Sequence, residues 1–349
     1  MYNFSFESMY LEITSFCNRS CPYCYNDSDC TGDYLPKSVI AKLLAECKSK
    51  SIDYLTISGG EPFCHPEINE ILEELARLHM RAMIISNLST LSRERMKELL
   101  VAGYSIQATL DSCDAEKNDI TRGQGSHQAV MELLSVAHEI GKINKIALRF
   151  NISKDNVSEI EEMIEFAIAR GMPLLNLALL TRSGRGTNFA AVYDYNTDIL
   201  DLARLMHRFV ELQQAYEGRI RLRFPDLKEQ VGCALYADGE ISLSPKISPD
   251  GNVYFCQLFS GEENSLGNIK HQSLADVLNS EKAHGVAERV RKRKDMQKDC
   301  VGCQFTEFCM CGCPAVSVNQ TGSLYEKDDQ CAMIKFFMKE KIKQMCTML

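Results

Sequence analysis

The chain has 349 residues, of which 45% are hydrophobic and 25% charged, and its formal net charge at pH 7 is −8. A chain of this size can bury a sizeable core and hold two domains, or one domain with an extension. The acidic balance gives no support for a nucleic-acid-binding surface. Residues 1–17 lack the features of a signal peptide, and no apolar run approaches the ~18 residues of a membrane span. We therefore expect a cytoplasmic protein with neither a nucleic acid nor a membrane as partner.

Cysteine is unusually frequent, with 16 residues in the chain. Three of them lie within residues 17–24 and five within residues 300–313. In a reducing cytosol, clustered cysteines indicate metal binding or catalysis rather than disulfides.

Short apolar runs alternate with amphipathic segments through the first half of the chain. The runs predict strands at residues 9–14, 53–58, 81–86, 104–110, 145–152 and 174–180. The intervening segments predict helices at residues 38–50, 67–79, 92–101, 128–140 and 158–170. Such alternation is typical of a parallel sheet with right-handed crossovers. Because a closed barrel needs more repeats, we expect an α/β fold in which an open, partial (β/α)6 TIM-like barrel carries functional residues at its carboxyl strand ends.

The pattern changes after about residue 190, where loops and cysteines become more frequent. Residues 197–216 predict a long helix, and a hairpin between residues 220 and 260 is expected to turn at the Pro-Asp-Gly of residues 249–251. Further helices are expected at residues 273–278, 281–293 and 333–345. A cysteine-rich region with little continuous apolar pattern is expected to depend on metal for stability. We expect four parts: an N-terminal segment (1–8), the barrel (9–190), a linking helix and connection (191–232) and a C-terminal domain (233–349).

Three cysteines, Cys17, Cys21 and Cys24, follow the first predicted strand with the spacing CxxxCxxC. Their thiolates could bind three irons of a four-iron cluster and leave one iron without a protein ligand. Structural zinc normally needs four ligands, and no obvious fourth lies beside these three. A disulfide is disfavoured by the compartment and would leave one thiol over.

This spacing, with Tyr23 beside the last cysteine, resembles the radical S-adenosylmethionine (SAM) superfamily. In that family the open iron binds the amino and carboxylate groups of SAM. An electron from the reduced cluster, which must have a low potential, then cleaves SAM. The resulting 5′-deoxyadenosyl radical abstracts a hydrogen atom from the substrate, and a closed site prevents its side reactions.

The second predicted strand ends in Ser58-Gly59-Gly60-Glu61-Pro62, which resembles the GGEP motif of the same family. The resemblance implies that Gly59, Gly60, Glu61 and Pro62 surround the SAM ammonium, where glycine allows close approach of the backbone. Taken alone, this sequence would be read as an ordinary tight turn; its position after the cysteine triplet gives it the further meaning.

Further family motifs follow in the expected order. The resemblance places seven more residues near SAM: Ser86, Asn87, Thr109, Asp111, Arg122, Asn151 and Arg185. Arg122 would bind the SAM carboxylate, and Thr109 stands where relatives have serine. Thr109 and Asn151 could instead be caps or residues of solvated turns, and Arg185, in a Gly-Arg-Gly sequence, could be a solvated loop residue.

The C-terminal cysteines resemble the SPASM extension of radical SAM enzymes that mature peptides and proteins. The resemblance implies a nearer cluster held by Cys233, Cys256 and Cys313, and a distal cluster held by Cys300, Cys303, Cys309 and Cys331. Cys233 is separated from Gly251 by a slightly longer spacer than is usual. Zinc is the alternative, because CxxC pairs also bind zinc. With the N-terminal triplet, the expected cofactors are three [4Fe-4S] clusters and SAM.

Six cysteines remain without such an assignment: Cys30, Cys47, Cys64, Cys113, Cys311 and Cys346. Most are expected to be bystanders, either buried or at the surface. Cys64 lies just beyond the GGEP-like motif, and its thiol could return a hydrogen atom to a substrate radical.

The resemblance implies a maturase that abstracts hydrogen from a residue of a ribosomally made precursor peptide and then crosslinks, epimerises or oxidises it. Expected partners are the precursor, a reductant such as flavodoxin or ferredoxin and, because only eight residues precede the first predicted strand, a possible separate leader-binding protein. Porphyrin tailoring in haem biosynthesis is the main alternative. Anaerobic sulfatase maturation is disfavoured, since Gln257 follows Cys256 where those enzymes have aspartate. A non-enzymatic iron–sulfur electron carrier is a third alternative, which the GGEP-like motif and Arg122 disfavour.

Overall fold

Six β/α repeats form the first half of the chain, as the sequence predicts. The computed structural model describes residues 2–224, 233–237 and 239–347. The six predicted strands are β2 (Met9–Thr14), β3 (Tyr54–Gly59), β4 (Arg81–Ile85), β5 (Ser105–Thr109), β6 (Ile146–Ile152) and β7 (Leu174–Leu179). The predicted helices are α1 (Lys37–Ser49), α2 (Ile68–Arg77), α3 (Arg93–Val101), α5 (Ser126–Glu139), α6 (Ile160–Ala169) and α7 (Ile199–Ala215).

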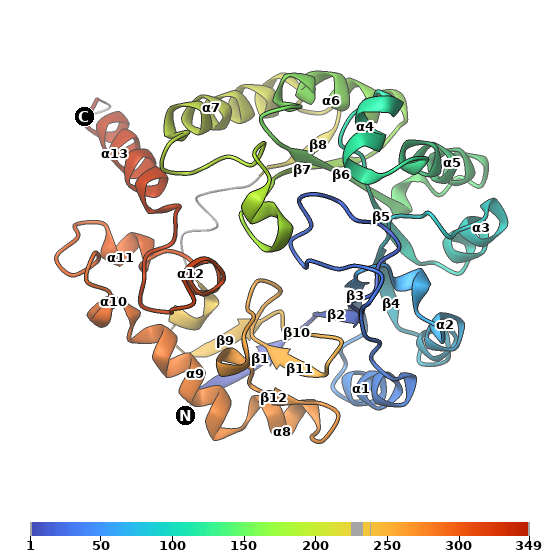
Figure 1. The fold of residues 1–349 in the computed structure, drawn as a ribbon, viewed down its shortest axis with the longest axis horizontal. Coiled ribbons are helices and arrows are strands. Elements are labelled where there is room, and N and C mark those ends of the chain that lie inside the picture. Colours follow the sequence, from blue (N-terminus) through green and yellow to red (C-terminus); the bar gives the residue numbers. More distant parts are fainter. Residues whose placement is uncertain (1, 225–232, 238, 348–349) are drawn as a thin grey trace.

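These strands belong to a ten-stranded sheet in which β2 to β7 pair in parallel and in chain order. The short strand β8 (Arg221–Arg223) extends this parallel series beyond β7. The sheet's two edges are β8 and β12 (Gly267–Asn268), so the barrel is open, as predicted. The helices lie around the outside of the curved sheet (Figure 1).

The two faces of the sheet differ in chemistry. Alternate side chains such as Ile57, Ile106 and Leu148 are fully buried and pack against the helices. Their neighbours on the inner face include polar residues such as Tyr10 and Arg149. A packed barrel interior is dominated by bulky aliphatic residues. A polar inner face is instead suited to holding ligands.

The C-terminal half adds the strands β10 (Lys246–Ile247), β11 (Asn252–Tyr254) and β12 to the same sheet. The strands β10 and β11 form the predicted antiparallel hairpin around residues 249–251. β10 also pairs in parallel with β2, which places Lys246 opposite Tyr10. A second, two-stranded sheet joins β1 (Asn3–Phe6) to β9 (Glu240–Leu243). The N-terminal residues are therefore tied to the C-terminal half.

Helices complete the ring on the side opposite α1 to α6 (Figure 1). They are α8 (Leu274–Leu278), α9 (Glu281–Arg291), α10 (Arg293–Met296), α11 (Thr306–Cys309), α12 (Pro314–Thr321) and α13 (Cys331–Thr347). One continuous hydrophobic cluster includes residues of both halves, from Met9 to Met333. Within the described residues, no helix combines the length and apolar character that crossing a membrane requires.

Several of the described elements were not predicted from the sequence, among them β1, β8, α4 (Ala115–Arg122), α11 and α12. β1, β8, α11 and α12 are short, and their formation depends on neighbours that are distant in the chain. The helix α4 has a polar sequence with one fully buried position, Asn118, and therefore lacks an apolar stripe.

Candidate active site

The N-terminal cysteine triplet lies on a loop between β2 and α1 that is fastened back onto the end of its own strand. Ser15 N donates to Asp33 O (3.0 Å), Cys17 N to Asp29 O (2.7 Å) and Leu35 N to Ile13 O (2.8 Å). These bonds fold residues 15–35 over the carboxyl end of the sheet, in the middle of the ring (Figure 1).

Cys17, Cys21 and Cys24 are all half-buried and lie close enough together to influence one another's ionisation. Burial raises the pKa of the Cys17 thiol to about 11, and the nearby charges of Glu61, Cys21 and Cys24 act in the same direction. Three thiolates at such a site need positive charge to compensate them, and bound iron supplies that charge.

The GGEP-like turn packs directly against the start of the cysteine loop. Gly60 N donates to Thr14 O and Glu61 N to Phe16 O, both at 2.8 Å. A Cβ atom at Gly59 or Gly60 would overlap the backbone of β2 or the residues after it. Glycine is therefore required here for the contact between two strand ends, whatever its role toward SAM.

Glu61 is fully buried and links three strand ends. Its carboxylate accepts hydrogen bonds from Ser86 Oγ (2.8 Å), Asn87 N (2.6 Å) and Phe63 N (3.1 Å). Asn87 in turn lies beside the cysteine loop, with Nδ2 3.7 Å from Cys17 Sγ. Pro62 begins the 3₁₀ helix η1 (Pro62–Cys64), which places the half-buried Cys64 at its end.

Tyr23, Asp111 and Arg122 form a buried polar cluster on the other side of the cysteine loop. Tyr23 donates its hydroxyl proton to Asp111 Oδ2, and Arg122 Nη1 donates to the Tyr23 hydroxyl oxygen (3.0 Å). Burial raises the pKa of Tyr23 well above its ordinary value, so the phenol stays protonated. The positive charge of Arg122 also lies near Cys21.

One oxygen of Asp111 lacks a partner. Asp111 Oδ1 is buried without a hydrogen bond, whereas Oδ2 accepts from both Tyr23 and Thr121. An unsatisfied carboxylate oxygen in the interior is costly and needs a donor. A polar ligand such as SAM, which carries hydroxyl and amino donors, fits this position.

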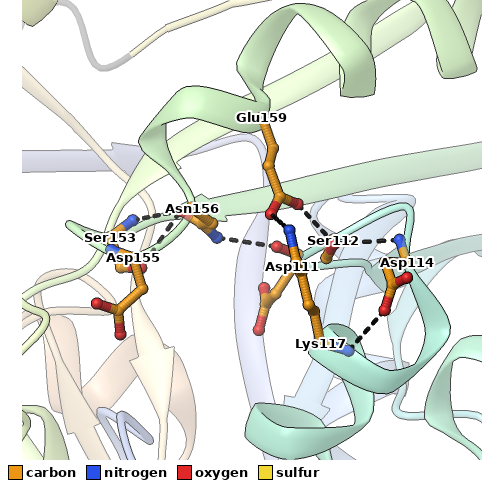
Figure 2. Close-up of polar contacts among 8 residues, drawn as sticks. All are labelled: Asp111, Ser112, Asp114, Lys117, Ser153, Asp155, Asn156 and Glu159. Carbon is orange, nitrogen blue, oxygen red and sulfur yellow. Dashed lines mark hydrogen bonds and ion pairs between the residues drawn. The ribbon is translucent and has the colours of Figure 1, made fainter.

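Residues that the sequence did not single out hold Asp111 in place (Figure 2). Asn118 Oδ1 accepts from Asp111 N (2.9 Å), and Asn156 Nδ2 donates to the carbonyls of Asp111 (2.9 Å) and Asn151 (2.8 Å). Glu159 binds Ser112 Oγ (2.5 Å) and Lys117 Nζ (2.7 Å). This network joins the ends of β5 and β6 to α4. The sequence signal for Asn118, Asn156 and Glu159 was weak, because each is a polar residue in a loop or on a polar helix.

Arg185 forms hydrogen bonds with the cysteine loop. It lies in the 3₁₀ helix η4 (Gly184–Asn188) and donates from Nε to Cys21 O (2.9 Å), from Nη2 to Ser28 O (3.0 Å) and from Nη1 to Asp27 Oδ1 (2.9 Å). Its backbone N–H also donates to Cys24 O at 3.0 Å. Arg185 therefore holds the cysteine loop in place through both its side chain and its backbone.

The two weaker candidates lie on the inner face of the sheet. Thr109 ends β5 opposite Arg149 of β6, and Asn151 Oδ1 accepts from Arg149 Nε at 2.8 Å. On the neighbouring strand, Asn176 is opposite Arg149, and its Oδ1 is buried without a hydrogen bond. The inner face thus contains both donors and acceptors that face one another across strands.

Further polar groups lie on the inner face near β2. Tyr10 donates to Ser58 Oγ (2.8 Å), and the Tyr10 and Tyr25 hydroxyl oxygens are 3.0 Å apart. Tyr25 is 40% exposed, yet surrounding protein raises its pKa well above the ordinary value. The sequence signal for this face was the alternation of polar and apolar residues within Met9–Thr14.

The inner face leads toward the C-terminal cysteines. Glu12 is buried, accepts from Asn26 Nδ2 (3.0 Å) and lies near Lys246 of β10. Lys246 also lies near Cys256, the residue two positions after β11. The pairing of β10 with β2 therefore connects the barrel interior with the C-terminal cysteines.

The structure places the seven C-terminal candidates in two groups of neighbouring cysteines. In the first group Cys233, Cys256 and Cys313 are mutually close, and burial raises the pKa of Cys233 to about 12. In the second, Cys300 is close to Cys303, and Cys309 is close to Cys331 and Cys300. The sequence did not assign Cys311, which is buried with its sulfur against that of Cys300.

Within the described residues, no group of three or more His, Cys, Asp or Glu side chains could hold a single metal ion. This finding concerns single ions only, because a four-iron cluster distributes its protein ligands over several irons. Sets made of soft thiolate donors suit iron–sulfur clusters.

Comparisons with known proteins agree with this geometry. Residues 11–167 match the model of the radical SAM superfamily, and residues 241–304 match that of the SPASM iron–sulfur cluster-binding domain. The antilisterial bacteriocin subtilosin biosynthesis protein AlbA of Bacillus subtilis is 27% identical over 96% of this chain and 72% of its own. The AdoMet-dependent heme synthase of Methanosarcina barkeri is 24% identical over 92% of this chain and 94% of its own.

Solved structures share the fold. Streptococcus suis SuiB bound to S-adenosylmethionine superposes with a TM-score of 0.74 at 18% identity, covering 95% of this chain and 77% of SuiB. Native anSMEcpe with bound AdoMet and the Cp18Cys peptide gives a TM-score of 0.73 at 16% identity, covering 99% of each chain. The chain therefore belongs to the radical SAM superfamily and is one of its enzymes that bind SAM and iron–sulfur clusters and carry a C-terminal SPASM domain.

Proposed function

We propose that this enzyme modifies a residue of a ribosomally made precursor peptide by crosslinking, epimerising or oxidising it. The polar inner face of the sheet is the observation that carries this proposal. A peptide brings backbone donors and acceptors into the barrel, and each needs a hydrogen-bonding partner when it is buried. Tyr10, Tyr25, Arg149 and the unpartnered Asn176 Oδ1 offer such partners.

Relatives support the same conclusion. They include AlbA and the PqqA peptide cyclase of Bradyrhizobium diazoefficiens, which is 24% identical over 93% of this chain and 85% of its own. Because these matches cover 96% and 93% of this chain, the similarity extends into both of its halves.

The proposed site has three four-iron clusters and one SAM molecule. Cys17, Cys21 and Cys24 would hold the first cluster, and the two C-terminal groups would each hold one. When bound, the first cluster and SAM supply the radical that abstracts a substrate hydrogen.

The chain's own residues bind and orient SAM. We assign the carboxylate of SAM to Arg122, because a fixed guanidinium pairs strongly with a carboxylate. The unpartnered Asp111 Oδ1 would accept from a SAM donor. Gly59 to Pro62, Ser86, Asn87, Thr109 and Asn151 would line the remainder of the site. Burial raises the pKa of the Cys64 thiol and so keeps it protonated. A hydrogen-atom donor needs this protonated form.

The proposed reaction needs two kinds of partner, a reductant and the precursor peptide. The low-potential cluster needs a one-electron reductant such as flavodoxin or ferredoxin. A precursor with a leader could bind the chain itself or a separate leader-binding protein.

Porphyrin tailoring in haem biosynthesis is the second candidate. It is supported by the heme synthase of Methanosarcina barkeri, of which the chain covers 94%. A flat macrocycle, however, needs a largely apolar slot, and the inner face near Tyr10 and Arg149 is polar.

Coexpression tests the two candidates together. The enzyme would be expressed with each short peptide encoded beside its gene, and the peptides analysed by mass spectrometry. With the native enzyme, and not with Cys17→Ala/Cys21→Ala/Cys24→Ala, we expect one peptide to change in mass, or, if it is epimerised, to contain a D-residue in chiral amino-acid analysis of its hydrolysate. Unchanged peptides, together with a bound tetrapyrrole seen by absorbance, would support the porphyrin reaction instead.

A further inference from the structure

Arg293, the first residue of α10, is the largest completely buried side chain in the part of the chain that the structure describes. Its Nη2 donates to Cys311 O (2.8 Å) and to Gln297 Oε1 (3.3 Å). Its Nε and Nη1 are buried without any hydrogen-bond partner. Among the described residues, no carboxylate forms an ion pair with this guanidinium. Arg293 is therefore a buried cation with unused donors.

The surroundings of Arg293 are rich in sulfur. Its charge acts on Cys233 of the first C-terminal group and on Cys300 of the second. The carbonyl that it binds belongs to Cys311, between Cys309 of one group and Cys313 of the other. Arg293 thus lies between the two groups and touches the segment that connects them.

That connecting segment has an unusual backbone. Met310, Cys311 and Gly312 all have positive φ angles, of 51°, 63° and 75°. Consecutive left-handed residues are costly unless surrounding contacts stabilise them. The bond from Arg293 to Cys311 O is one such contact, and the bond from Cys313 N to Asp328 Oδ2 (2.7 Å) is another.

A buried guanidinium needs negative charge nearby. Asp328 is a nearby carboxyl group, but it accepts its hydrogen bond from Cys313 N and forms no ion pair with Arg293. The thiolates of the two groups are a further source of negative charge beside the unpartnered Nε and Nη1. A cluster held by thiolates carries net negative charge, which increases when the cluster is reduced.

We propose that Arg293 is the shared counter-charge of the two C-terminal clusters, and that it raises their reduction potentials. Its unpartnered Nε–H and Nη1–H groups would be the donors available to cluster sulfur. Because a fixed positive charge stabilises the more negative, reduced state, the potential rises. Arg293 is a positioning residue that acts through the clusters. This inference rests on the part of the proposed function that assigns clusters to these cysteines.

The test measures the potential rather than the activity. Arg293→Gln removes the charge and keeps an N–H donor, whereas Arg293→Lys keeps the charge. Lys292→Gln is the matched control, because it removes an exposed charge at the adjacent position. Each substitution is made in the full chain with Cys17→Ala/Cys21→Ala/Cys24→Ala, so that only the C-terminal clusters give a signal. Iron content is measured, and the reduction is followed by electron paramagnetic resonance.

We expect Arg293→Gln to shift the one-electron reduction equilibrium at least tenfold toward the oxidised form, which corresponds to about 59 mV. Arg293→Lys and Lys292→Gln should stay closer to the parent protein. Loss of C-terminal iron in Arg293→Gln, with retention in Arg293→Lys, would also support a counter-charge. Unchanged potentials with full iron in Arg293→Gln would overturn the inference, as would equal iron loss in both Arg293 variants. Failure of the parent protein to bind C-terminal iron would instead contradict the cluster assignment.

Discussion

Arg122 brings a fixed positive charge to the buried cluster that also contains Tyr23 and Asp111. If it binds the SAM carboxylate, Arg122→Ala leaves that carboxylate poorly compensated. A hydrogen bond to a charged group contributes about 1.5–3 kcal/mol, so SAM affinity should fall roughly ten- to hundredfold. Iron content should not change, since Arg122 is not among the cluster ligands.

Equilibrium binding of SAM to the anaerobic protein measures this effect, with the exposed Arg77→Ala as control. Normal affinity in Arg122→Ala would remove Arg122 from the SAM site. Loss of iron would show that the substitution disturbs folding near Cys21.

Individual residues were predictable where a short motif marked them. Glu61, Asp111 and Arg122 stand in local sequence patterns, and the structure places Glu61 after β3, Asp111 after β5 and Arg122 at the end of α4. Arg293 and Asn156 were not predictable, because their partners lie in other segments. Neither has a local pattern that distinguishes a buried polar residue from an exposed one.

At the scale of elements, the contact between η4 and the cysteine loop is expected to help the protein retain its N-terminal cluster. Arg185 donates three side-chain bonds to this loop, each contributing about 1 kcal/mol. We expect Arg185→Ala to loosen the loop, so that the N-terminal cluster loses iron faster in air. Iron release over time measures this, with Arg204→Ala on the exposed face of α7 as control. A drop in SAM affinity with normal iron retention would favour direct contact with SAM instead.

The junction between α4 and α5 depends on Asp119. Its carboxylate accepts from Gly125 N (2.5 Å) and His127 N (2.9 Å) at the start of α5, and these backbone bonds outweigh burial and hold its pKa at about 2. It is therefore ionised at neutral pH. Losing a cap of this kind costs about 0.5–2 kcal/mol.

Asp119→Ala should therefore increase amide hydrogen exchange in the first turn of α5, while the exposed Glu116→Ala should not. Equal exchange in the two variants would show that α5 does not need this cap. The site should keep its iron in both, since neither residue is a candidate ligand.

Elements were predictable where hydrophobic periodicity was strong. The six β/α repeats have apolar strands of five to seven residues, and each strand was found close to its predicted bounds. β1 and β8 have only four and three residues, and each forms because a partner strand is provided by a distant segment. Such pairing is not visible in local sequence.

At the scale of the molecule, the barrel and the C-terminal region share one sheet and one hydrophobic core. Deleting residues 233–349 would remove β10 from the edge of β2 and β9 from β1. An exposed parallel edge with an uncovered apolar core favours aggregation. We expect the 1–232 fragment to be insoluble under conditions in which the full chain is soluble, as measured by sedimentation. A soluble fragment that binds about four irons would show that the barrel folds independently.

The central claim is that one N-terminal cluster cleaves SAM while two further clusters are held at the C-terminus. Iron content and 5′-deoxyadenosine formation, measured on one anaerobic preparation of native protein and of Cys17→Ala/Cys21→Ala/Cys24→Ala, test it most directly. The native protein should bind about twelve irons and form 5′-deoxyadenosine, whereas the variant should keep about eight irons and form none. Continued formation of 5′-deoxyadenosine by the variant would contradict the assignment of the N-terminal cluster. A native protein with about eight irons would contradict the presence of two C-terminal clusters.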